Sequence, residues 1–336
     1  MKNPSAVLHA PHDLRIEDRP IPTPAPGQVL VEVRATGICG SDVHYYDHGR
    51  IGDFVVREPM VIGHESAGTI VAVGDGVDPG RVGELVALEP GVPCRRCEQC
   101  RAGRYNLCPD VRFFATPPID GSIARFVAIE ADFAHRAPEG LSHEQAAMAE
   151  PVSVGIWACR KAAVGAGDRV LVTGAGPVGL LAGQVARAVG AAVVTVTDLN
   201  AFRVGTARDL GLDGRSAAEP LDAAYDVLLE CSGAVPAVAA GLRALAPAGR
   251  AVLVGMGADS VPIDVPLVQT KELTVTGTFR YANTYPAALA LIASGAVRTE
   301  PLVTHRWPLE ETEAALTLGR REPDSLKAMV LAPESD

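Results

Sequence analysis

The sequence predicts an α/β protein that combines a β-rich domain with a doubly wound parallel-sheet domain. Three observations lead to this expectation. The 336 residues suffice for two compact domains, each with its own core. Hydrophobic residues make up 48% of the chain and 34 residues are glycine, which is typical of folds with many tight turns between strands and helices. After Pro151, short strands separated by turns give way to strands that alternate with helices.

Short β segments occupy the chain up to roughly residue 150. Residues 28–34 alternate between apolar and polar side chains with period two, and residues 66–74 form a second β segment that ends at a glycine. Frequent Gly and Pro residues separate these segments. Short strands with frequent turns favour an irregular β barrel for this part of the chain.

Strands and helices then alternate, which indicates βαβ units and a parallel sheet. The expected segments are strand 169–173, helix 178–189, strand 193–197, helix 201–210, and strands 226–230, 251–254 and 273–278. A helix at 286–294 and a closing strand at 328–331 follow. We therefore expect a first domain of residues 1–151, completed by 280–336, and an inserted domain of residues 152–279, with a cleft between the two.

The composition of the chain limits which partners and which cellular compartment are expected. The formal net charge is −10, and no long stretch is rich in Lys and Arg, so neither nucleic acid nor an anionic membrane is expected as a partner. No apolar run reaches membrane-spanning length, and the start, Met1-Lys2-Asn3-Pro4, lacks the apolar core of a signal peptide. Four of the seven cysteines crowd into residues 94–108, which favours metal ligation in a reducing cytoplasm over disulfides.

A glycine motif between a strand and a helix indicates a dinucleotide site. Gly174, Gly176 and Gly179 form G-x-G-x-x-G directly after strand 169–173, with Pro177 at the start of the helix. The first glycine permits the tight turn, the second lets the backbone approach a pyrophosphate, and the third permits close packing of helix on strand. The helix N-terminus supplies the positive end of a dipole.

The next strand ends at Asp198, 19 residues beyond Gly179. A carboxylate there accepts hydrogen bonds from the ribose hydroxyls and repels a 2′-phosphate, which favours NAD over NADP. Two alternatives stay open: Arg203, five residues on, could neutralise a phosphate, and Asp198 could simply cap a helix.

Four closely spaced cysteines, Cys94, Cys97, Cys100 and Cys108, suit a tetrahedral zinc ion. An iron–sulfur cluster is the rival, because Pro109 follows the last cysteine as in bacterial ferredoxins. The last gap, however, is seven residues rather than three, so we expect zinc. Because no His or carboxylate joins the four thiols, we expect a structural ion.

Three further polar clusters, residues 37–45, 63–65 and 150–151, carry side chains suited to chemistry. With these, the chain resembles the zinc-containing medium-chain dehydrogenases, of the sorbitol or xylitol (polyol) dehydrogenase type. The matching segments span nearly the whole chain and are residues 37–45, 62–68, 94–108, 104–107, 115–118, 150–155, 172–179, 197–199, 230–233, 279–284 and 301–305. The resemblance implies a GroES-like β barrel for the first domain, a Rossmann domain for the second, and a homotetramer.

The resemblance also implies a catalytic zinc site. Cys39, His64 and Glu65 match its ligands, Glu150 matches a carboxylate that either ligates the metal or holds its water, and Asp42 matches an acid that orients the histidine. Both Glu65 and Glu150 are candidates for the direct ligand. This zinc would polarise the substrate hydroxyl so that hydride passes to the nicotinamide of NAD.

The proton is expected to leave through Ser41 and His44, or through water held by Glu150. The residues that the resemblance places around the substrate are Tyr45, Phe114, Thr116, Glu150, Arg280 and Tyr281. In addition to the glycine motif and Asp198, the resemblance places further residues at the cofactor: Val178, Arg203, Val254, Gly255, Met256, Thr278, Phe279 and Arg280. Two alternatives stay open: Tyr45 could serve only in core packing, and Arg280 could be a solvated surface charge.

Two departures from the family pattern bear on these expectations. Residues 211–225 form a shorter segment than usual, so a strand or helix on the adenine side is expected to be trimmed. Near Phe113 and Phe114 one residue is missing, which leaves open which phenylalanine faces the substrate.

The expected function is thus NAD-linked, zinc-dependent oxidation of a secondary hydroxyl of a small polyol, with two zinc ions per chain. Two alternatives stay open. The same fold could act on another alcohol, such as threonine, an aldose or an aminocyclitol. A non-catalytic cofactor-binding relative is the other, although such a protein has no physical need for an open zinc site.

Overall fold

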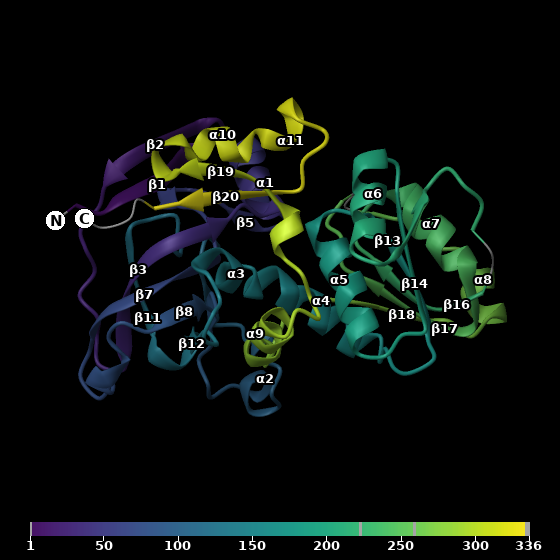
Figure 1. Cartoon of the computed structure of the whole chain (residues 1–336), viewed down its shortest axis with the longest axis horizontal. Helices are drawn as coiled ribbons and strands as arrows, with labels where there is room; N and C mark the ends of the chain where they lie inside the picture. The colour runs from purple at the N-terminus through teal and green to yellow at the C-terminus, as the bar shows by residue number, and fades with distance from the viewer. Residues whose placement is uncertain (1, 222–223, 258–259, 333–336) are drawn as a thin grey trace. The chain divides into compact units, whose positions relative to one another are not determined.

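The computed structural model describes residues 2–221, 224–257 and 260–332. Contacts divide the chain into two compact units: residues 1–150 with 302–336 form the first unit, and residues 151–301 form the second (Figure 1). Among the described residues, no helix is both long enough and apolar enough to cross a membrane.

The first unit is mainly β structure. Its strands are β1 (Pro4–Ala10), β2 (Asp13–Asp18), β3 (Gln28–Gly37), β4 (Arg50–Ile51), β5 (Phe54–Val55), β6 (Met60–Val61), β7 (Glu65–Val73), β8 (Leu85–Leu88), β9 (Gly91–Val92), β10 (Arg112–Phe113), β11 (Phe126–Glu130), β12 (Ala134–Arg136), β19 (Val303–Pro308) and β20 (Lys327–Leu331). Its helices are α1 (Gly40–His48), α2 (Glu98–Arg101), α3 (His143–Ala147), α10 (Thr312–Leu316) and α11 (Leu318–Arg321). Short 3-10 turns are η1 (Pro79–Arg81), η2 (Tyr105–Leu107), η3 (Ala131–Phe133), η4 (Glu300–Leu302), which spans the boundary of the units, and η5 (Leu309–Glu311).

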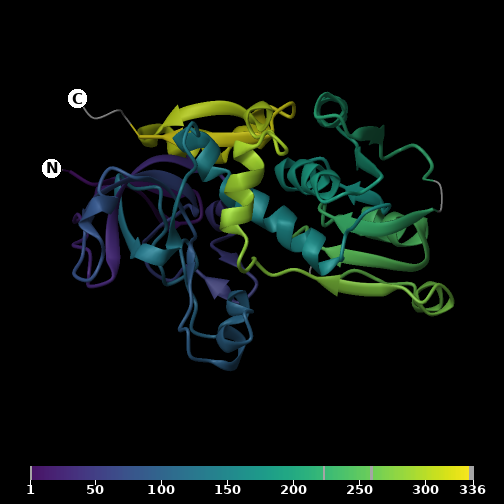
Figure 2. The same ribbon diagram turned by 60° about the horizontal axis from the view of Figure 1, so that its bottom comes forward.

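A seven-stranded sheet is the centre of this unit. Six of its strands run in the order β12-β8-β7-β3-β20-β19, and β11 also pairs with β3. Strands from the two ends of the chain therefore share one sheet, and β20, in yellow, lies beside β3 in Figures 1 and 2. This pairing brings the C-terminal strand next to the segment that follows β3, where Cys39 lies.

The second unit is a parallel sheet flanked by helices. Its elements are α4 (Ala149–Lys161, which starts within the first unit), β13 (Arg169–Thr173), α5 (Pro177–Ala188), β14 (Val193–Asp198), α6 (Ala201–Asp209), β15 (Asp213–Ser216), β16 (Tyr225–Glu230), α7 (Val235–Ala244), β17 (Leu245–Leu253), α8 (Val265–Thr270), β18 (Thr274–Gly277) and α9 (Tyr285–Ala293). The six strands run in the order β15-β14-β13-β16-β17-β18, all parallel. This is the doubly wound order in which the direction of winding reverses beside the first strand.

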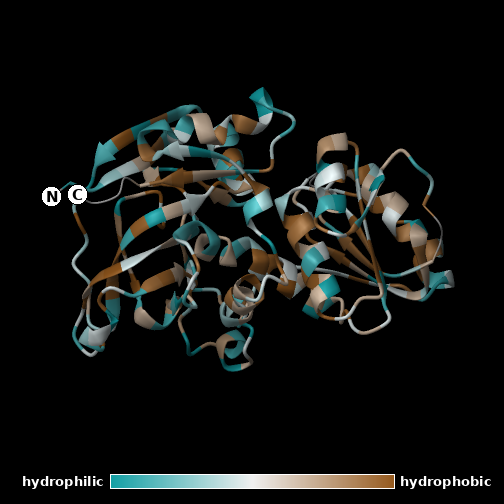
Figure 3. Cartoon of the chain, viewed as in Figure 1, coloured by the Kyte–Doolittle hydropathy of each residue, from teal (hydrophilic) through white to brown (hydrophobic). Residues whose placement is uncertain are grey.

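Burial explains why these segments form parallel strands. Val170, Leu171 and Val172 of β13 are fully buried, because helices cover both faces of such a sheet. Figure 3 shows hydrophobic residues concentrated along the strands of this sheet. The doubly wound α/β architecture expected from the sequence is therefore confirmed, with element limits close to those expected, apart from β17, which starts at Leu245.

Two expectations about the second unit differ from the structure. The shortened segment 211–225 still forms strand β15, paired in parallel with β14, so the strand on this edge is retained; residues 222 and 223 lie outside the described residues. The second boundary falls at residue 302 rather than 280. The reason is hydrogen bonding: Arg160 donates to the Asn283 carbonyl, and Gln184 and Arg298 bond to each other, which ties residues 283–298 to α4 and α5.

Candidate metal and cofactor sites

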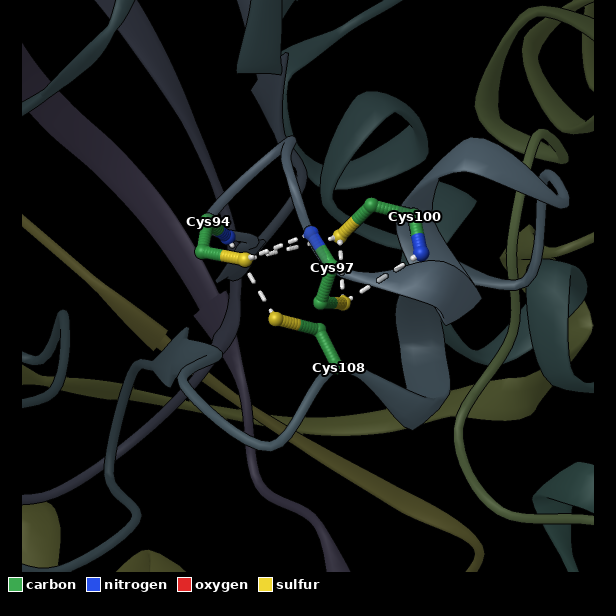
Figure 4. Close-up of side chains that lie close together, drawn as sticks. All are labelled: Cys94, Cys97, Cys100 and Cys108. Atoms are coloured by element: carbon green, nitrogen blue, oxygen red, sulfur yellow. Dashed lines mark hydrogen bonds between the residues drawn. The ribbon is translucent and has the colours of Figure 1, made fainter.

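Four cysteines meet in a loop of the first unit, as Figure 4 shows. The Sγ atoms of Cys94, Cys97, Cys100 and Cys108 all lie within 4.8 Å of one another. Cys97 and Cys100 have their Sγ atoms 3.3 Å apart, and Cys94 and Cys100 have theirs 4.0 Å apart. A tetrahedral zinc ion with bonds of about 2.3 Å places its sulfur ligands about 3.8 Å apart. The four thiols thus fit one ion, whereas a cluster of several irons needs wider spacing.

Backbone N–H groups prepare these sulfurs to bind metal. Cys97 caps the N-terminus of α2, and its Sγ accepts a hydrogen bond from the Cys100 N–H at 3.4 Å. Hydrogen bonds from the backbone of Arg96 and Cys97 lower the pKa of Cys94 to about 7. Burial raises the pKa of Cys100 to about 12. All four thiols are free of disulfides, which leaves the set available to a metal.

A second donor group consists of Cys39, His64 and Glu65. Their ligand atoms lie within 4.8 Å of one another; His64 and Glu65 are buried, and Cys39 is partly buried. Cys39 lies between β3 and α1, His64 directly precedes β7, and Glu65 is the first residue of β7. Because β3 pairs with β7 in register Gly37 with Glu65, the two segments meet. Thiolate, imidazole and carboxylate suit Zn²⁺, and three protein ligands leave one position open.

Asp42 holds this group together from within α1. Its Oδ2 accepts a hydrogen bond from the Cys39 N–H at 2.9 Å, and its Oδ1 accepts one from the Gly63 N–H at 3.1 Å. The same Oδ1 lies 3.5 Å from Nδ1 of His64. Burial disfavours the charged His64 ring, but Asp42 and Cys39 outweigh it and raise the His64 pKa well above its usual value. The structure places Asp42 beside the histidine, as expected.

Sequence reasoning missed one residue of this group, Lys327. Its Nζ lies 2.7 Å from each Glu65 carboxylate oxygen, and its side chain is only 3% exposed. Burial disfavours the ammonium, but the charges of Glu65, Cys39 and Glu150 outweigh it and raise the pKa of Lys327. The only signal in the sequence is a lysine immediately before an apolar closing strand.

Glu150 and the expected proton relay, Ser41 and His44, are not among the three donors of this group. Glu150 is 5% exposed in the first turn of α4 and falls outside the Cys39–His64–Glu65 group, although its charge acts on Lys327. Ser41 and His44 stand three residues apart on α1, so they share one face of this helix. Ser41 is partly buried and His44 is exposed.

The glycine motif forms a tight strand-to-helix turn. Gly174 has φ +89°, a conformation that L side chains rarely adopt, and a Cβ there would collide with Ser232. A Cβ at Gly179 would collide with the Gly174 carbonyl. At Gly176, the N-cap of α5, the space that a Cβ would fill is empty. The turn therefore offers an open backbone at the helix N-terminus, which suits a pyrophosphate.

Asp198 ends β14 beside this turn. Its Oδ2 accepts a hydrogen bond from the Ala175 N–H at 2.8 Å, and its Oδ1 accepts one from the Asn200 N–H at 2.9 Å. Asn200, not Asp198, caps α6 by accepting a bond from the Arg203 N–H. The helix-cap alternative for Asp198 is therefore wrong. Nε of Arg203 is buried and has no hydrogen-bond partner among the described residues.

The other expected cofactor segments lie at the same edge of the sheet. Strands β13, β14, β16, β17 and β18 end in register, with Glu230 opposite both Thr173 and Leu253. Val254 and Gly255 follow β17, and both of their N–H groups donate to the Glu230 carbonyl at 2.8 Å. Met256 and Phe279 are exposed, while the Thr278 N–H donates to the Leu253 carbonyl. Ligands of doubly wound sheets bind at this carboxyl edge.

The expected substrate residues fall in both units. In the first, Tyr45 is 4% exposed and packs in an apolar cluster, Phe114 packs against a second cluster, and Thr116 bridges to Ile119. In the second, the buried Tyr281 ring lies 5.8 Å from the Tyr285 ring. The Arg280 guanidinium lies 4.7 Å from the centre of the Phe279 ring.

Comparison with known proteins matches both parts of this arrangement. Residues 25–139 match the alcohol dehydrogenase GroES-like domain, and residues 177–294 match the zinc-binding dehydrogenase domain. The chain is 44% identical to the sorbitol dehydrogenase of Mus musculus over 100% of this chain and 97% of that protein.

Solved structures show the same fold. L-idonate 5-dehydrogenase from Escherichia coli superposes with a TM-score of 0.92 at 28% identity, covering 98% of each chain. A short chain alcohol dehydrogenase from E. coli CFT073, complexed with the cofactor NADH, superposes with a TM-score of 0.91 at 28% identity. That match covers 98% of this chain and 99% of the other.

Proposed function

This chain belongs to the zinc-binding dehydrogenase family, and we propose that it oxidises a secondary hydroxyl of a polyol such as sorbitol or xylitol to a ketose with NAD. The observation that carries the proposal is the buried group of Cys39, His64 and Glu65. It offers three protein ligands to one metal ion, which is the pattern of catalytic rather than structural zinc. Full-length similarity to sorbitol dehydrogenases supports the polyol.

The chemistry divides between the bound groups and the chain. When bound, zinc would supply Lewis acidity that lowers the pKa of the substrate hydroxyl, and NAD would supply the acceptor for the hydride. Cys39, His64 and Glu65 would hold the metal, and Asp42 would fix the orientation of His64. Glu150, outside the group of three, would hold a water near the metal rather than ligate the metal directly.

Ser41 and His44 are proposed to carry the proton away. Ser41 is partly buried and His44, one turn later on α1, is exposed, so a proton released inside reaches solvent in two steps. A neutral imidazole accepts such a proton near neutral pH. The expected substrate contacts, Tyr45, Phe114 and Thr116 with Arg280 and Tyr281 of the second unit, are part of the same proposal.

Cofactor choice is proposed to rest on Asp198. We expect Asp198→Ala to lower kcat/KM for NAD by about 10–100-fold, since a hydrogen bond to a charged group contributes roughly 1.5–3 kcal/mol. The rate with NADP is expected to fall less, because repulsion of its 2′-phosphate disappears. The measurement is initial-rate kinetics with both cofactors at saturating polyol.

Asp213→Ala is the matched control. Asp213 is a carboxylate on the neighbouring strand β15, where it accepts hydrogen bonds from Thr195 and Arg215. This variant is expected to keep the wild-type ratio of NAD to NADP activity. An unchanged ratio in Asp198→Ala as well would show that another residue selects the cofactor.

A metal assay and a substrate panel test the function directly. We expect two zinc ions per chain, one in the four-cysteine loop and one at Cys39, His64 and Glu65. Incubation with NAD and sorbitol, xylitol or galactitol is expected to produce the absorbance of NADH. One zinc per chain would indicate a non-catalytic relative, and turnover of threonine or a simple alcohol but of no polyol would exclude the polyol.

We also propose that the protein acts in the cytoplasm as a homotetramer. Its seven cysteines are free of disulfides, which suits a reducing compartment, and the tetramer rests on family resemblance. Light scattering of the purified protein measures the assembly directly; a monomeric mass would contradict this part of the proposal.

A further inference from the structure

Lys327 is saturated with hydrogen bonds inside the first unit. An ammonium has three N–H donors. One donates to the Ile38 carbonyl at 3.0 Å, and the other two reach the Glu65 carboxylate oxygens at 2.7 Å each. The side chain of Glu65 is 1% exposed, so water does not compete for these contacts. The position of the ammonium is therefore fixed by three partners.

These partners flank the candidate metal ligands. Ile38 directly precedes Cys39, and Glu65 directly follows His64. The backbone fixes Lys327 there, because β20 pairs with the end of β3 and the Ile38 N–H donates to the Ala328 carbonyl at 3.0 Å. On the other side, a Cβ at Gly37 would overlap Oε2 of Glu65. The Glu65 carboxylate thus lies in a slot bounded by Gly37 and Lys327.

The slot leaves Glu65 able to bind a metal. Its carboxylate has about four lone-pair positions, of which Lys327 uses two. A Glu65 oxygen already lies within 4.8 Å of the ligand atoms of Cys39 and His64. Carboxylates that ligate metals are commonly held by hydrogen bonds of this kind, which set their orientation.

We propose that Lys327 is a positioning residue of the catalytic metal centre, which holds the Glu65 carboxylate in the orientation that ligates zinc. The inference rests on the proposed zinc at Cys39, His64 and Glu65. It gives a role to a buried lysine whose hydrogen bonds go to Ile38 and Glu65. It also explains why a cation is buried beside a metal site: the anionic side chains of Cys39, Asp42, Glu65 and Glu150 together exceed the charge of the metal.

The test compares Lys327→Met with Lys327→Arg in the full-length protein as purified with its metal. Zinc affinity is measured by competition with a chelator, and Co²⁺ exchanged into the site reports ligand geometry through its visible absorption. We expect Lys327→Met to bind zinc 10–100-fold more weakly at one of two sites, the range typical of lost partners of metal ligands. Its Co²⁺ bands are expected to shift. Arginine, which can donate two parallel bonds to a carboxylate, is expected to restore both properties largely.

Lys271→Met is the matched control. Nζ of Lys271 donates to the carbonyls of Arg243 and Leu245 in the second unit, so this variant also loses a lysine held by hydrogen bonds. It is expected to keep the zinc affinity and Co²⁺ spectrum of the wild type. Should Lys327→Met fail to fold, zinc affinity and the Co²⁺ spectrum are measured on Lys327→Gln instead. Glutamine is also uncharged, but its amide can still donate a hydrogen bond to one of the buried acceptors.

The outcomes separate the inference from the proposed function. If the wild type holds two metals and the uncharged variant shows the same affinity and spectrum, Lys327 has only a structural role, even if the variant is less stable. If the wild type holds one metal, in the four-cysteine loop, both this inference and the proposed function fail.

Discussion

Replacing Cys97 by serine is expected to release the metal of the four-cysteine loop and to destabilise the first unit. Structural zinc contributes about 10–16 kcal/mol of binding free energy in zinc-finger peptides. If a quarter of this is lost, about 3 kcal/mol, the thermal midpoint falls by roughly 6–12 °C for a domain of this size. Cys97 is chosen because its Sγ is both a candidate ligand and the cap of α2.

The measurement combines metal content with thermal unfolding. Cys159→Ser is the control, because Cys159 is buried in α4 and belongs to neither candidate metal group, and its Sγ donates to the Ala182 carbonyl, a bond that serine can keep. It is expected to retain two zinc ions per chain. A Cys97→Ser variant with unchanged zinc content and midpoint would show that the loop needs no ion.

Replacing His64 by alanine is expected to abolish turnover while leaving the fold intact. The variant loses an imidazole ligand, so one of two zinc ions leaves and the Lewis acidity that the proposed reaction needs is lost. That acidity is worth several kcal/mol, and each 1.36 kcal/mol is a factor of ten, so kcat is expected to fall by about 10³-fold or more. Affinity for NAD is expected to stay, because the cofactor residues belong to the second unit.

His143→Ala is the matched control. His143 is a half-buried histidine of the same unit whose Nε2 lies 3.1 Å from Oγ1 of Thr69, and it belongs to no candidate metal group. Burial and the charge of Arg34 lower its pKa, so it is neutral near pH 7. Its loss is expected to leave zinc content and kcat close to wild type. Wild-type turnover in His64→Ala would refute the catalytic site.

Local patterns in the sequence were sufficient to predict much of the fold. The alternation of strands and helices after Pro151, with the glycine motif between β13 and α5, predicted the parallel sheet, because periodicity and turn residues act within a few residues of one another. The four-cysteine site could be predicted in the same way, since all its ligand atoms come from one 15-residue loop.

Expectations that depended on hydrogen bonds between residues distant in the sequence agreed less well with the structure. Residues 283–298 join the second unit because Arg160 and Gln184 bond to them, more than a hundred positions away along the chain. The helix cap next to Asp198 is Asn200, and only the hydrogen bonds of α6 distinguish the two side chains. Although residues 211–225 form a shortened segment, β15 is retained, because its four residues are enough to pair with β14.

By itself, the sequence determined the doubly wound sheet, the cysteine loop, the glycine turn and the candidate ligands Cys39, His64 and Glu65, the last through family resemblance. Only the tertiary structure decided that these three donors converge while Glu150 stays outside their group, and that Lys327 holds Glu65. The physical reason is distance along the chain. Lys327 and Glu65 are 262 residues apart, and the pairing of β20 with β3 and of β3 with β7 brings them together.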